Sequence, residues 1–375
     1  MARTVVGLND PKAVRKYSAM LAVDIGRTSY FGKKFMSSGE RAQTPIQNIT
    51  DLERGAGDNV TYDLSLQLKM KPIQGDSNLR GNEENMRFAS DNLFIDQLRG
   101  GVNTGGKMTQ KRTLINLRET ARARQSEWWS RLMDESFFIY LSGARGANED
   151  YIEDTNFTGY AGNAFSAPDS MHLLYGGSAT SKATLEATDK FSLALIDKAV
   201  SRASTMGGGT AGIPAMQPVT IDGEEHYVLV IHPWQTYDLR TNAGTGGWLD
   251  IQKAAAAAEG RNNPMFKGGL GMYNNVIIHE HRGVIRFNDF GAGSNVNAAR
   301  ALFMGRQAAV VAYGKSGVDV DNRYDWTEEL EDRGNQVVIT TACMIGIKKT
   351  NFVVDGVARD FGVIALDTAA KDSTI

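Results

Sequence analysis

The clearest strand pattern in the chain lies close to residue 60. From Val60 to Met70 apolar and polar residues alternate, which places the apolar side chains on one face of an extended strand. These apolar positions are Val60, Tyr62, Leu64, Leu66, Leu68 and Met70. A polar, glycine-containing stretch follows at residues 74–85, and a second extended run covers residues 86–98. The pattern predicts a long two-stranded hairpin with a broad loop, which must lie on other structure because an isolated hairpin is only marginally stable.

A second pattern predicts a long helix over residues 107–141. Apolar residues recur at spacings that keep them on one side of a helix. These positions are Leu114, Leu117, Ala121, Trp128 and Leu132. Thr109 is the expected N-cap and Gly143 the expected stop, so that ~32 residues at ~1.5 Å per residue make a rod on the order of 48 Å. A separate, basic face of the helix carries Lys111, Arg118 and Arg122.

The rest of the chain mixes weaker helix and strand patterns. Residues 1–50 show little periodicity and predict an extended arm with short helical pieces, whereas residues 142–181 predict a loop-rich insertion. Helices are expected at Thr188–Thr205, from Pro233 onward and at Trp248–Glu259. Strands are expected at His226–Ile231, at Asn275–His279, within Leu302–Tyr313 and at Gln336–Ile347. Because helices and strands do not alternate regularly, the fold class is α+β rather than doubly wound.

Length and composition fit an ordinary globular protein. The 375 residues are 42% hydrophobic, which is ample material for a core and for two or three domains. The single cysteine, Cys343, excludes a disulfide framework, and its place in an apolar, strand-like run predicts a buried structural thiol rather than a nucleophile. No signal peptide and no membrane-spanning segment is found, which predicts a soluble, intracellular protein.

Charge is distributed unevenly along the chain. The formal net charge of −2 argues against a dedicated nucleic-acid binder. Basic residues nevertheless concentrate between Arg99 and Arg131, and an acidic cluster lies between Asp325 and Asp332. Opposed patches of this kind suit contacts between subunits, while for any single charge a solvated surface is the simpler interpretation.

Two histidines are the best candidates for a metal site. His279 and His281 are expected on one face at the end of a strand, where both rings can point the same way. A zinc site needs a third or fourth ligand, and no cysteine lies near these histidines in the sequence. A polar strand end is therefore the favoured interpretation, with a metal-dependent enzyme at His279 and His281 as a remote alternative.

Two further segments imitate ligand-binding loops but lack essential residues. Residues 309–316 resemble the end of a phosphate-binding loop, but Ala309 stands where glycine is required. Residues 319–330 resemble a calcium loop, with Tyr324 and Leu330 at the positions that need glycine and glutamate. The sequence therefore predicts no catalytic, cofactor or metal site.

Several short blocks of the sequence keep an order that is found in one known protein family. Early blocks are Thr50–Thr61 and Leu79–Glu84, and the most specific ones are Ile95–Arg99, Gly106–Arg112 and Leu141–Gly146. Later blocks are Val230–Pro233 with Gln235 and Leu239, Asn263–Pro264 with residues 268–271, and Asn274–Ile278. Together they resemble the major capsid proteins of N-four-type podophages, a family assigned to the Hong Kong 97 capsid fold. The resemblance spans about residues 27–365 and has no counterpart for residues 142–181.

The resemblance implies a Hong Kong 97-type major capsid fold made of consecutive segments. The N-terminal arm would be residues 1–50 and the extension hairpin loop residues 51–100. Residues 101–185 would form the spine helix and the peripheral domain, including the insertion at 142–181. Residues 186–325 would form the axial domain, and residues 326–375 would return to the peripheral domain.

The function implied by the resemblance is self-assembly without catalysis. Hexamers and pentamers of such a late protein would close an icosahedral phage head around double-stranded DNA, with the packaged DNA on the inner surface. The protein would occupy the host cytoplasm during assembly and the virion capsid afterwards. Scaffold, portal and decoration proteins are further candidate partners, and neither a cofactor nor a membrane is expected. An encapsulin-like nanocompartment shell that holds cargo is the alternative function.

Two sets of residues are the candidate contact sites. In the extension loop, Glu83, Glu84 and Arg87 are expected to contact an adjacent subunit. The two glutamates would meet the basic patch between Arg99 and Arg131 of that subunit. The basic face of Lys111, Arg118 and Arg122 would face either packaged DNA, whose phosphates it would contact without reading sequence, or another subunit.

Overall fold

The computed structural model describes residues 11–39, 42–53, 57–68, 70–113, 115–207, 213–221, 223–241, 269–314 and 323–372, with the side chains of residues 11–17 left aside. The helix predicted at Trp248–Glu259 lies outside these residues, as does Leu114 of the predicted apolar stripe. None of the helices in the described ranges is both long and apolar enough to cross a membrane.

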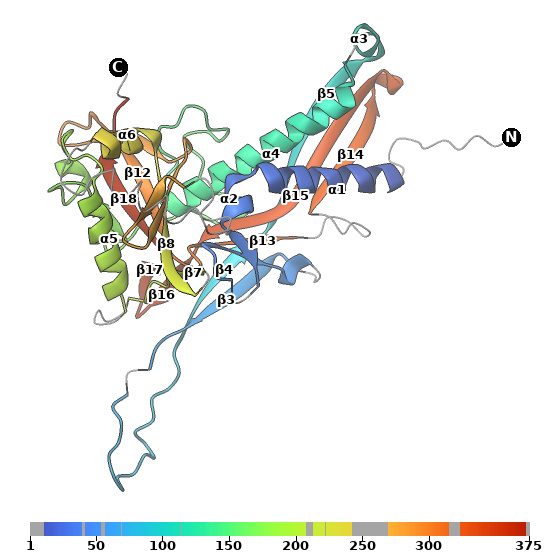
Figure 1. The fold of residues 1–375 in the computed structure, drawn as a ribbon. Helices are drawn as coiled ribbons and strands as arrows, with labels where there is room; N and C mark the ends of the chain where they lie inside the picture. Colours follow the sequence, from blue (N-terminus) through green and yellow to red (C-terminus); the bar gives the residue numbers. More distant parts are fainter. Residues whose placement is uncertain are drawn as a thin grey trace.

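The first of two large sheets surrounds one long strand, β15 (Gln336–Lys349). Its order is β1 (Met36–Ser38), β2 (Ile46–Ile49), β13 (Ala309–Tyr313), β15 and β14 (Tyr324–Glu331), and β5 (Asp96–Gly106) also pairs with β15. The first eight residues of β15 lie between β14 and β5, and the last five pair with β13. A single 14-residue strand thus connects the two ends of this elongated sheet (Figure 1).

The second sheet forms the other half of the molecule. Its order is β6 (Leu173–Tyr175), β18 (Val363–Ala369), β12 (Val296–Met304), β8 (Glu224–Ile231), β10 (Val276–Glu280) and β9 (Gly271–Tyr273), with β11 (Arg286–Phe290) on β12 and β7 (Val219–Ile221) on β8. Helix α5 (Leu193–Thr205) buries Leu195, Ile196, Ala199 and Ala203. Helix α6 (Pro233–Thr241) starts at Pro233, directly after β8. The predicted strand at His226–Ile231 and both of these helices are confirmed.

The helix predicted at residues 107–141 is interrupted. A short helix, α3 (Lys107–Arg112), ends at Thr113, whose backbone is extended, and the spine helix α4 (Leu117–Ser142) begins four residues later. The N-cap of α4 is Asn116, whose side chain accepts hydrogen bonds from the backbone N–H groups of Arg118 and Glu119 at 3.2 and 3.5 Å. The expectation that Thr109 caps a single helix was therefore wrong, because Asn116 is the stronger capping residue.

The C-terminal half of α4 lies between the two sheets and is buried on nearly all sides. Gly143 ends the helix with a left-handed backbone (φ 66°), as predicted. Of the predicted apolar stripe, Ala121 and Leu132 are buried, but Trp129 rather than Trp128 is the fully buried tryptophan. The Trp129 indole N–H donates to Thr341 on β15 at 2.8 Å, which fixes α4 on the first sheet.

The N-terminal segment differs from the predicted extended arm. Residues 11–28 form the 18-residue helix α1 (Pro11–Thr28), which lies along α4 and β14 and buries Leu21 and Ile25. A short helix, α2 (Tyr30–Lys34), follows, and β1 and β2 then join the first sheet. The prediction missed α1 because its described buried positions, Leu21 and Ile25, are too few to give a clear period.

The strands of the C-terminal segment are divided between the two sheets. Strands β14 and β15 lie in the first sheet, and β16 (Asn351–Val354) pairs with β17 (Val357–Asp360) beside it. The last strand, β18, lies inside the second sheet. All seven residues of β18 are buried, and such a strand requires neighbours on both edges, here β12 and β6.

The insertion at residues 142–181 is loop-rich, as predicted. Its described secondary structure is the three-residue strand β6. Aromatic side chains hold the remainder in place, since Tyr151, Phe157, Tyr160 and Phe165 pack against the main core. Short one-turn helices lie elsewhere at η1 (Asp51–Glu53), η2 (Lys182–Thr184) and η3 (Asp332–Gly334).

Candidate intersubunit surfaces

A two-stranded hairpin projects from the body of the molecule (Figure 1). Strand β3 (Asn59–Ser65) pairs antiparallel with β4 (Phe88–Phe94), which confirms the predicted hairpin, although the alternating pattern continues to Met70. We call residues 66–87 the extension loop. Its apolar residues Leu68, Met70, Leu79 and Met86 have exposed fractions of 57, 51, 54 and 63%. Nothing in the described part of the chain covers these side chains, so the extension loop is a candidate contact surface.

The base of this hairpin is held firmly. Tyr62, Leu64 and Leu66 pack against a buried cluster of Ala89, Phe352, Val354 and Phe361. Arg87 forms an ion pair with Asp355 at 3.1 Å, and Lys348 forms one with Asp91. Asp355 and Gly356 both have positive φ, as in a two-residue hairpin turn between β16 and β17. The β16–β17 hairpin therefore supports the base while the extension loop projects beyond it.

The three predicted contact residues of the loop have different surroundings. The Glu83 carboxylate accepts a hydrogen bond from the Gly81 N–H at 2.7 Å and is exposed. The Glu84 carboxylate accepts one from the Met70 N–H at 2.6 Å, which links the two arms of the loop. Arg87 is engaged by Asp355 of its own chain. The structure thus gives Arg87 an internal role, and the contacts of Glu83 and Glu84 with another subunit stay a prediction.

The predicted basic face is divided between two helices instead of lying on one. Lys111 lies on α3, whereas Arg118 and Arg122 lie on α4. Arg118 forms an ion pair with Glu328 of β14 at 2.6 Å, and Arg122 forms one with Asp24 of α1 at 3.6 Å. The shared face was predicted wrongly because the chain breaks between α3 and α4. Arg118 and Arg122 instead join the spine helix to its own neighbours.

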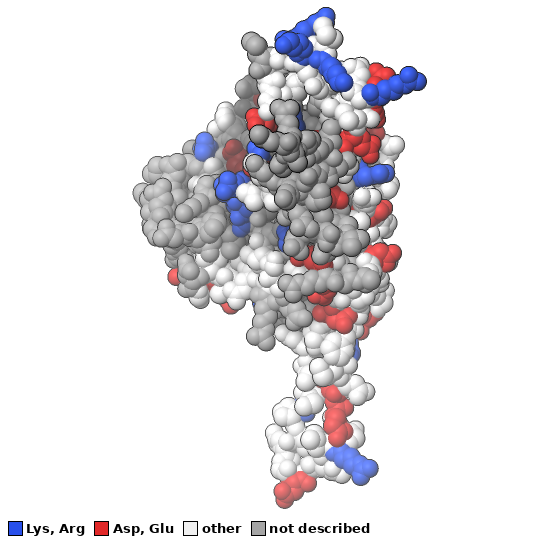
Figure 2. Space-filling view, turned by 90° about the vertical axis from the view of Figure 1, so that its right-hand side faces the viewer, with Lys and Arg blue, Asp and Glu red and all other residues white. Residues whose placement is uncertain are grey.

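Helix α3 is the most exposed helix among the residues described. None of its six residues is buried, and Met108 and the adjacent Ile115 have exposed fractions of 62 and 66%. Its cations are Lys107, Lys111 and Arg112. Figure 2 shows lysine and arginine side chains gathered at this end of the molecule. The acidic cluster of β14 is close by, but Glu328 is only 3% exposed and receives hydrogen bonds from Arg118 and from the Trp326 indole.

The candidate metal and thiol residues are packed into the core. His279 is buried against Phe35, and His281 stacks on Phe138. Burial, with Arg282 and Lys34 nearby, lowers the pKa of His281 to about 4. Cys343 is buried as predicted, and burial raises the pKa of its thiol. Within the described ranges, no three His, Cys, Asp or Glu side chains are grouped so that they could hold a metal ion.

Residues 309–316 and 319–330, which resemble ligand-binding loops in sequence, were predicted to bind no ligand. Residues 309–313 form the fully buried strand β13, as that interpretation requires. Residues 315–322, which include the end of the phosphate-loop imitation and the start of the calcium-loop imitation, lie outside the described residues.

Comparison with known proteins decides the class of this chain. Residues 5–372 match the family described as phage capsid protein. The chain belongs to that family. The major capsid protein of Pseudomonas phage KPP25 is 28% identical over 359 residues, which cover 89% of this chain and 90% of the relative. The solved capsid of Ralstonia phage GP4 is 51% identical with a TM-score of 0.84 and covers 99% of both chains. The cyanophage Pam1 capsid, 22% identical with a TM-score of 0.69 over 92% of this chain and 93% of that one, shows the same fold.

This phage capsid protein is therefore a major capsid protein of a phage head, located in the virion capsid. Its function is structural rather than enzymatic, so the remote alternative of an enzyme at His279 and His281 is set aside. The mixed fold with its long helix α4 is of the Hong Kong 97 type, as predicted. A capsid subunit assembles with copies of itself, and the protein is accordingly a component of a homo-oligomeric shell.

The capsid protein also contains a buried carboxylate that sequence reasoning missed. Asp134 on α4 accepts hydrogen bonds from the Ser29 hydroxyl at 2.8 Å and from the N–H groups of Tyr30 and Phe31 at 2.8 and 3.1 Å. It thereby fixes the turn between α1 and α2 on the spine helix. Burial raises the pKa of Asp134 to about 6, although these hydrogen bonds lower it. No local pattern reveals Asp134, because Ser29 lies 105 residues away in the sequence.

We expect the stability of the unassembled subunit to fall as the pH rises from about 4 to about 6. The pKa of Asp134 is about 6 in the folded state and ~3.9 in an unfolded chain, so the folded state binds the proton more readily in this interval. Urea unfolding at a series of pH values measures the effect. The Asp134→Asn variant should lose this pH dependence, and an unchanged profile would mean that another group titrates.

Proposed function

We propose that this capsid protein closes an icosahedral phage head around double-stranded DNA by laying its extension loop over an adjacent subunit. One observation carries the proposal: the hairpin is firmly held at its base, while the apolar side chains of the extension loop are exposed. The rigid base fixes the direction in which the loop projects. The free energy falls when the exposed apolar side chains of the loop are buried against another molecule. In a homo-oligomeric shell, that molecule is the next copy of the same chain.

The energetics favour many weak contacts over one strong contact. Burying a large apolar side chain such as Leu68 or Met86 contributes about 1.5–3 kcal/mol. Ordering each residue of the loop costs about 1–2 kcal/mol in backbone entropy, so one loop contributes little net free energy. Repetition of the contact around a closed symmetric shell stabilises the assembly as a whole.

Electrostatic attraction fixes the position of the loop on the adjacent subunit. We assign Glu83 and Glu84 to cations of the adjacent subunit within the patch Arg99–Arg131. Three arginines of that patch have carboxylate partners in their own chain, namely Arg118, Arg122 and Arg124. The exposed cations outside α3 to which the proposal then assigns the glutamates are Arg99 and Arg131.

Reversing the charge of the loop should block shell closure. A variant with Glu83→Lys and Glu84→Lys brings like charges together at every loop contact, and we expect unassembled subunits in place of shells. Sedimentation velocity and negative-stain microscopy measure the outcome. The matched control, Glu149→Lys with Glu225→Lys, makes the same charge change at exposed acidic positions outside the loop and should assemble. Normal shells from the loop variant would contradict the assignment of Glu83 and Glu84.

Packaged DNA is the second partner that we propose, with the cations of α3 facing it. Lys107, Lys111 and Arg112 are exposed, and phosphate contacts of this kind do not depend on sequence. Alanine at all three positions should leave assembly intact and reduce the DNA retained in particles, measured by buoyant density. Failure of assembly would instead assign α3 to a contact between subunits.

We also place this capsid protein with the N-four-type podophage proteins, because its sequence blocks follow one another in the same order as in that family. In that arrangement the first sheet would belong to the peripheral domain and most of the second sheet to the axial domain of hexamers and pentamers. Scaffold, portal and decoration proteins would be its further partners during assembly.

A further inference from the structure

Strand β3 has one open edge. Within the described residues its only strand partner is β4, on the opposite edge. Hydrogen bonds from the Ile95 N–H to the Asp58 carbonyl (2.9 Å) and from the Leu66 N–H to the Arg87 carbonyl (3.0 Å) fix the phase of the ladder. The even-numbered residues of β3 therefore bond to β4. The odd-numbered residues Thr61, Asp63 and Ser65 direct their N–H and C=O groups toward the open edge.

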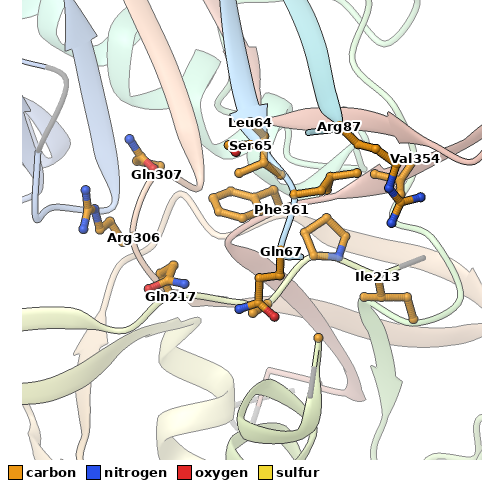
Figure 3. A pocket seen from close by; sticks show the side chains of 14 residues that line it. Leu64, Ser65, Gln67, Arg87, Ile213, Gln217, Arg306, Gln307, Val354 and Phe361 are labelled. Carbon is orange, nitrogen blue, oxygen red and sulfur yellow. The ribbon is translucent and has the colours of Figure 1, made fainter. Parts of the chain in front are cut away.

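A groove runs along this edge. A cavity of about 330 Å³ is lined by residues 60–64, and a second cavity of about 280 Å³ is lined by residues 64–67. The two cavities share the lining residues Leu64, Gln307 and Phe361, so they adjoin, and we call them together the groove along β3 and its continuation. Figure 3 shows Phe361 in the centre of the second cavity, with Leu64 beside it.

The lining of the groove matches the needs of an extended peptide. Its apolar side chains include Val60, Ile213, Pro214, Phe352, Val354 and Phe361, which can receive alternate side chains of a strand. Four amides also line the groove: the Gln307 amide donates to that of Gln47 (2.9 Å), and Gln67 and Gln217 supply donors and acceptors for a peptide backbone. The ends differ in charge, since Asp51 and Asp63 line the first cavity and Arg87 and Arg306 line the second.

We propose that the open edge of β3 is a strand-addition site, and that it is filled by residues 66–71 of the extension loop of a second copy of this chain. This inference rests on the proposed function and names the surface that receives the loop. The added segment would extend the β3–β4 ribbon to three strands across the subunit boundary. It would also cover an edge that is otherwise open to unspecific pairing.

Three observations favour the second copy as the occupant. Residues 66–70 continue the apolar alternation of β3 through Leu66, Leu68 and Met70, yet β3 ends at Ser65, as expected of a strand that lacks its partner. Lys71 is exposed at the end of this segment and complements Asp51 and Asp63 at one end of the groove. The segment cannot fill its own groove, because it continues β3 and leads away from the body (Figure 1).

A cysteine pair tests the contact in assembled particles. Because Cys343 is buried, introduced cysteines are the accessible thiols of the chain. Particles of the Lys71→Cys, Asp51→Cys variant should form covalent oligomers of the subunit under mild oxidation, seen as a ladder on a non-reducing gel. The control pairs Lys71→Cys with Asp289→Cys, at an exposed position on the second sheet, and should give no ladder. Intact particles without a ladder overturn this inference and leave the proposed function standing.

A backbone variant tests the hydrogen bonds themselves. Ser65→Pro removes an outward N–H and leaves the bonds to β4 in place, because proline is tolerated on the open side of an edge strand. The matched control, Ser65→Ala, keeps the N–H. We expect the proline variant to remain folded and its yield of shells to fall roughly tenfold or more, since the loss is repeated at every contact. Equal yields of shells from Ser65→Pro and Ser65→Ala would overturn the inference. Normal shells in which a different protein occupies the groove would also overturn it.

Discussion

Replacement of Arg300 by methionine is expected to lower the free energy of unfolding by about 3–5 kcal/mol, because it leaves a buried carboxylate without its partner. The Arg300 guanidinium donates to both carboxylate oxygens of Asp367, at 2.7 and 2.6 Å, and to the carbonyl of Ser142 at 2.8 Å. Both side chains are buried. Burial alone would lower the pKa of Arg300, but the Asp367 carboxylate outweighs it and the pKa is raised.

The double variant Arg300→Met, Asp367→Leu separates the pair from its packing. It removes both charges and should recover much of the lost stability. In the single variant Arg300→Met, by contrast, the buried Asp367 carboxylate stays in the core without a cation. Denaturant unfolding of the subunit measures all three proteins. An exposed pair supplies the comparison, since Arg124→Ala breaks the ion pair with Glu127 on the surface and should cost less than about 1 kcal/mol. Equal stability of wild type and Arg300→Met would show that Arg300 does not join the second sheet to the end of α4.

Gly143→Ala is the second substitution with a large expected effect, roughly 2–4 kcal/mol of destabilisation. Gly143 has a left-handed backbone, and an added Cβ would lie 2.0 Å from the carbonyl oxygen of Ser166. The loop-rich insertion crosses the end of α4 at this point, so the clash involves backbone that cannot rotate away. Thermal unfolding followed by circular dichroism measures the loss.

Gly162→Ala is the matched control for that substitution. Gly162 also has a positive φ, of 73°, but no heavy atom lies within 4 Å of the added Cβ. The control isolates the backbone strain, which should cost about 1 kcal/mol. If both variants lose the same stability, the close approach of Ser166 to Gly143 contributes nothing.

The elements that could be predicted from the sequence are those set by local patterns. The alternation after Val60 predicted β3, and the apolar stripe of residues 188–205 predicted the buried face of α5. Gly143 and Pro233 marked a helix end and a helix start, because their backbone conformations are nearly independent of the rest of the fold.

The elements that escaped prediction depend on contacts distant in sequence. Helix α1 is held by α4 and β14 more than by its own pattern, and β18 is assigned to its sheet by pairing with β12 and β6. The two-residue turn at Asp355 and Gly356 was a local signal that could have revealed the β16–β17 hairpin, since Asp-Gly between apolar residues is typical of such turns.

The candidate site divides in the same way. The hairpin itself followed from sequence, but the partners of its charged residues did not. The sequence cannot show that Arg87 binds Asp355, because 268 residues separate them. Nor can it show that Arg118 binds Glu328, 210 residues away. Charge patterns predict surfaces, whereas only the folded chain shows which charges are already paired.

Electron cryo-microscopy of assembled particles would show where the extension loop of each subunit lies. We expect residues 66–87 of each subunit to lie over an adjacent subunit, which covers Leu68, Met70, Leu79 and Met86. A loop that lies on its own subunit, or that extends into solvent without touching a neighbour, would contradict the claim that the extension loop holds the shell together.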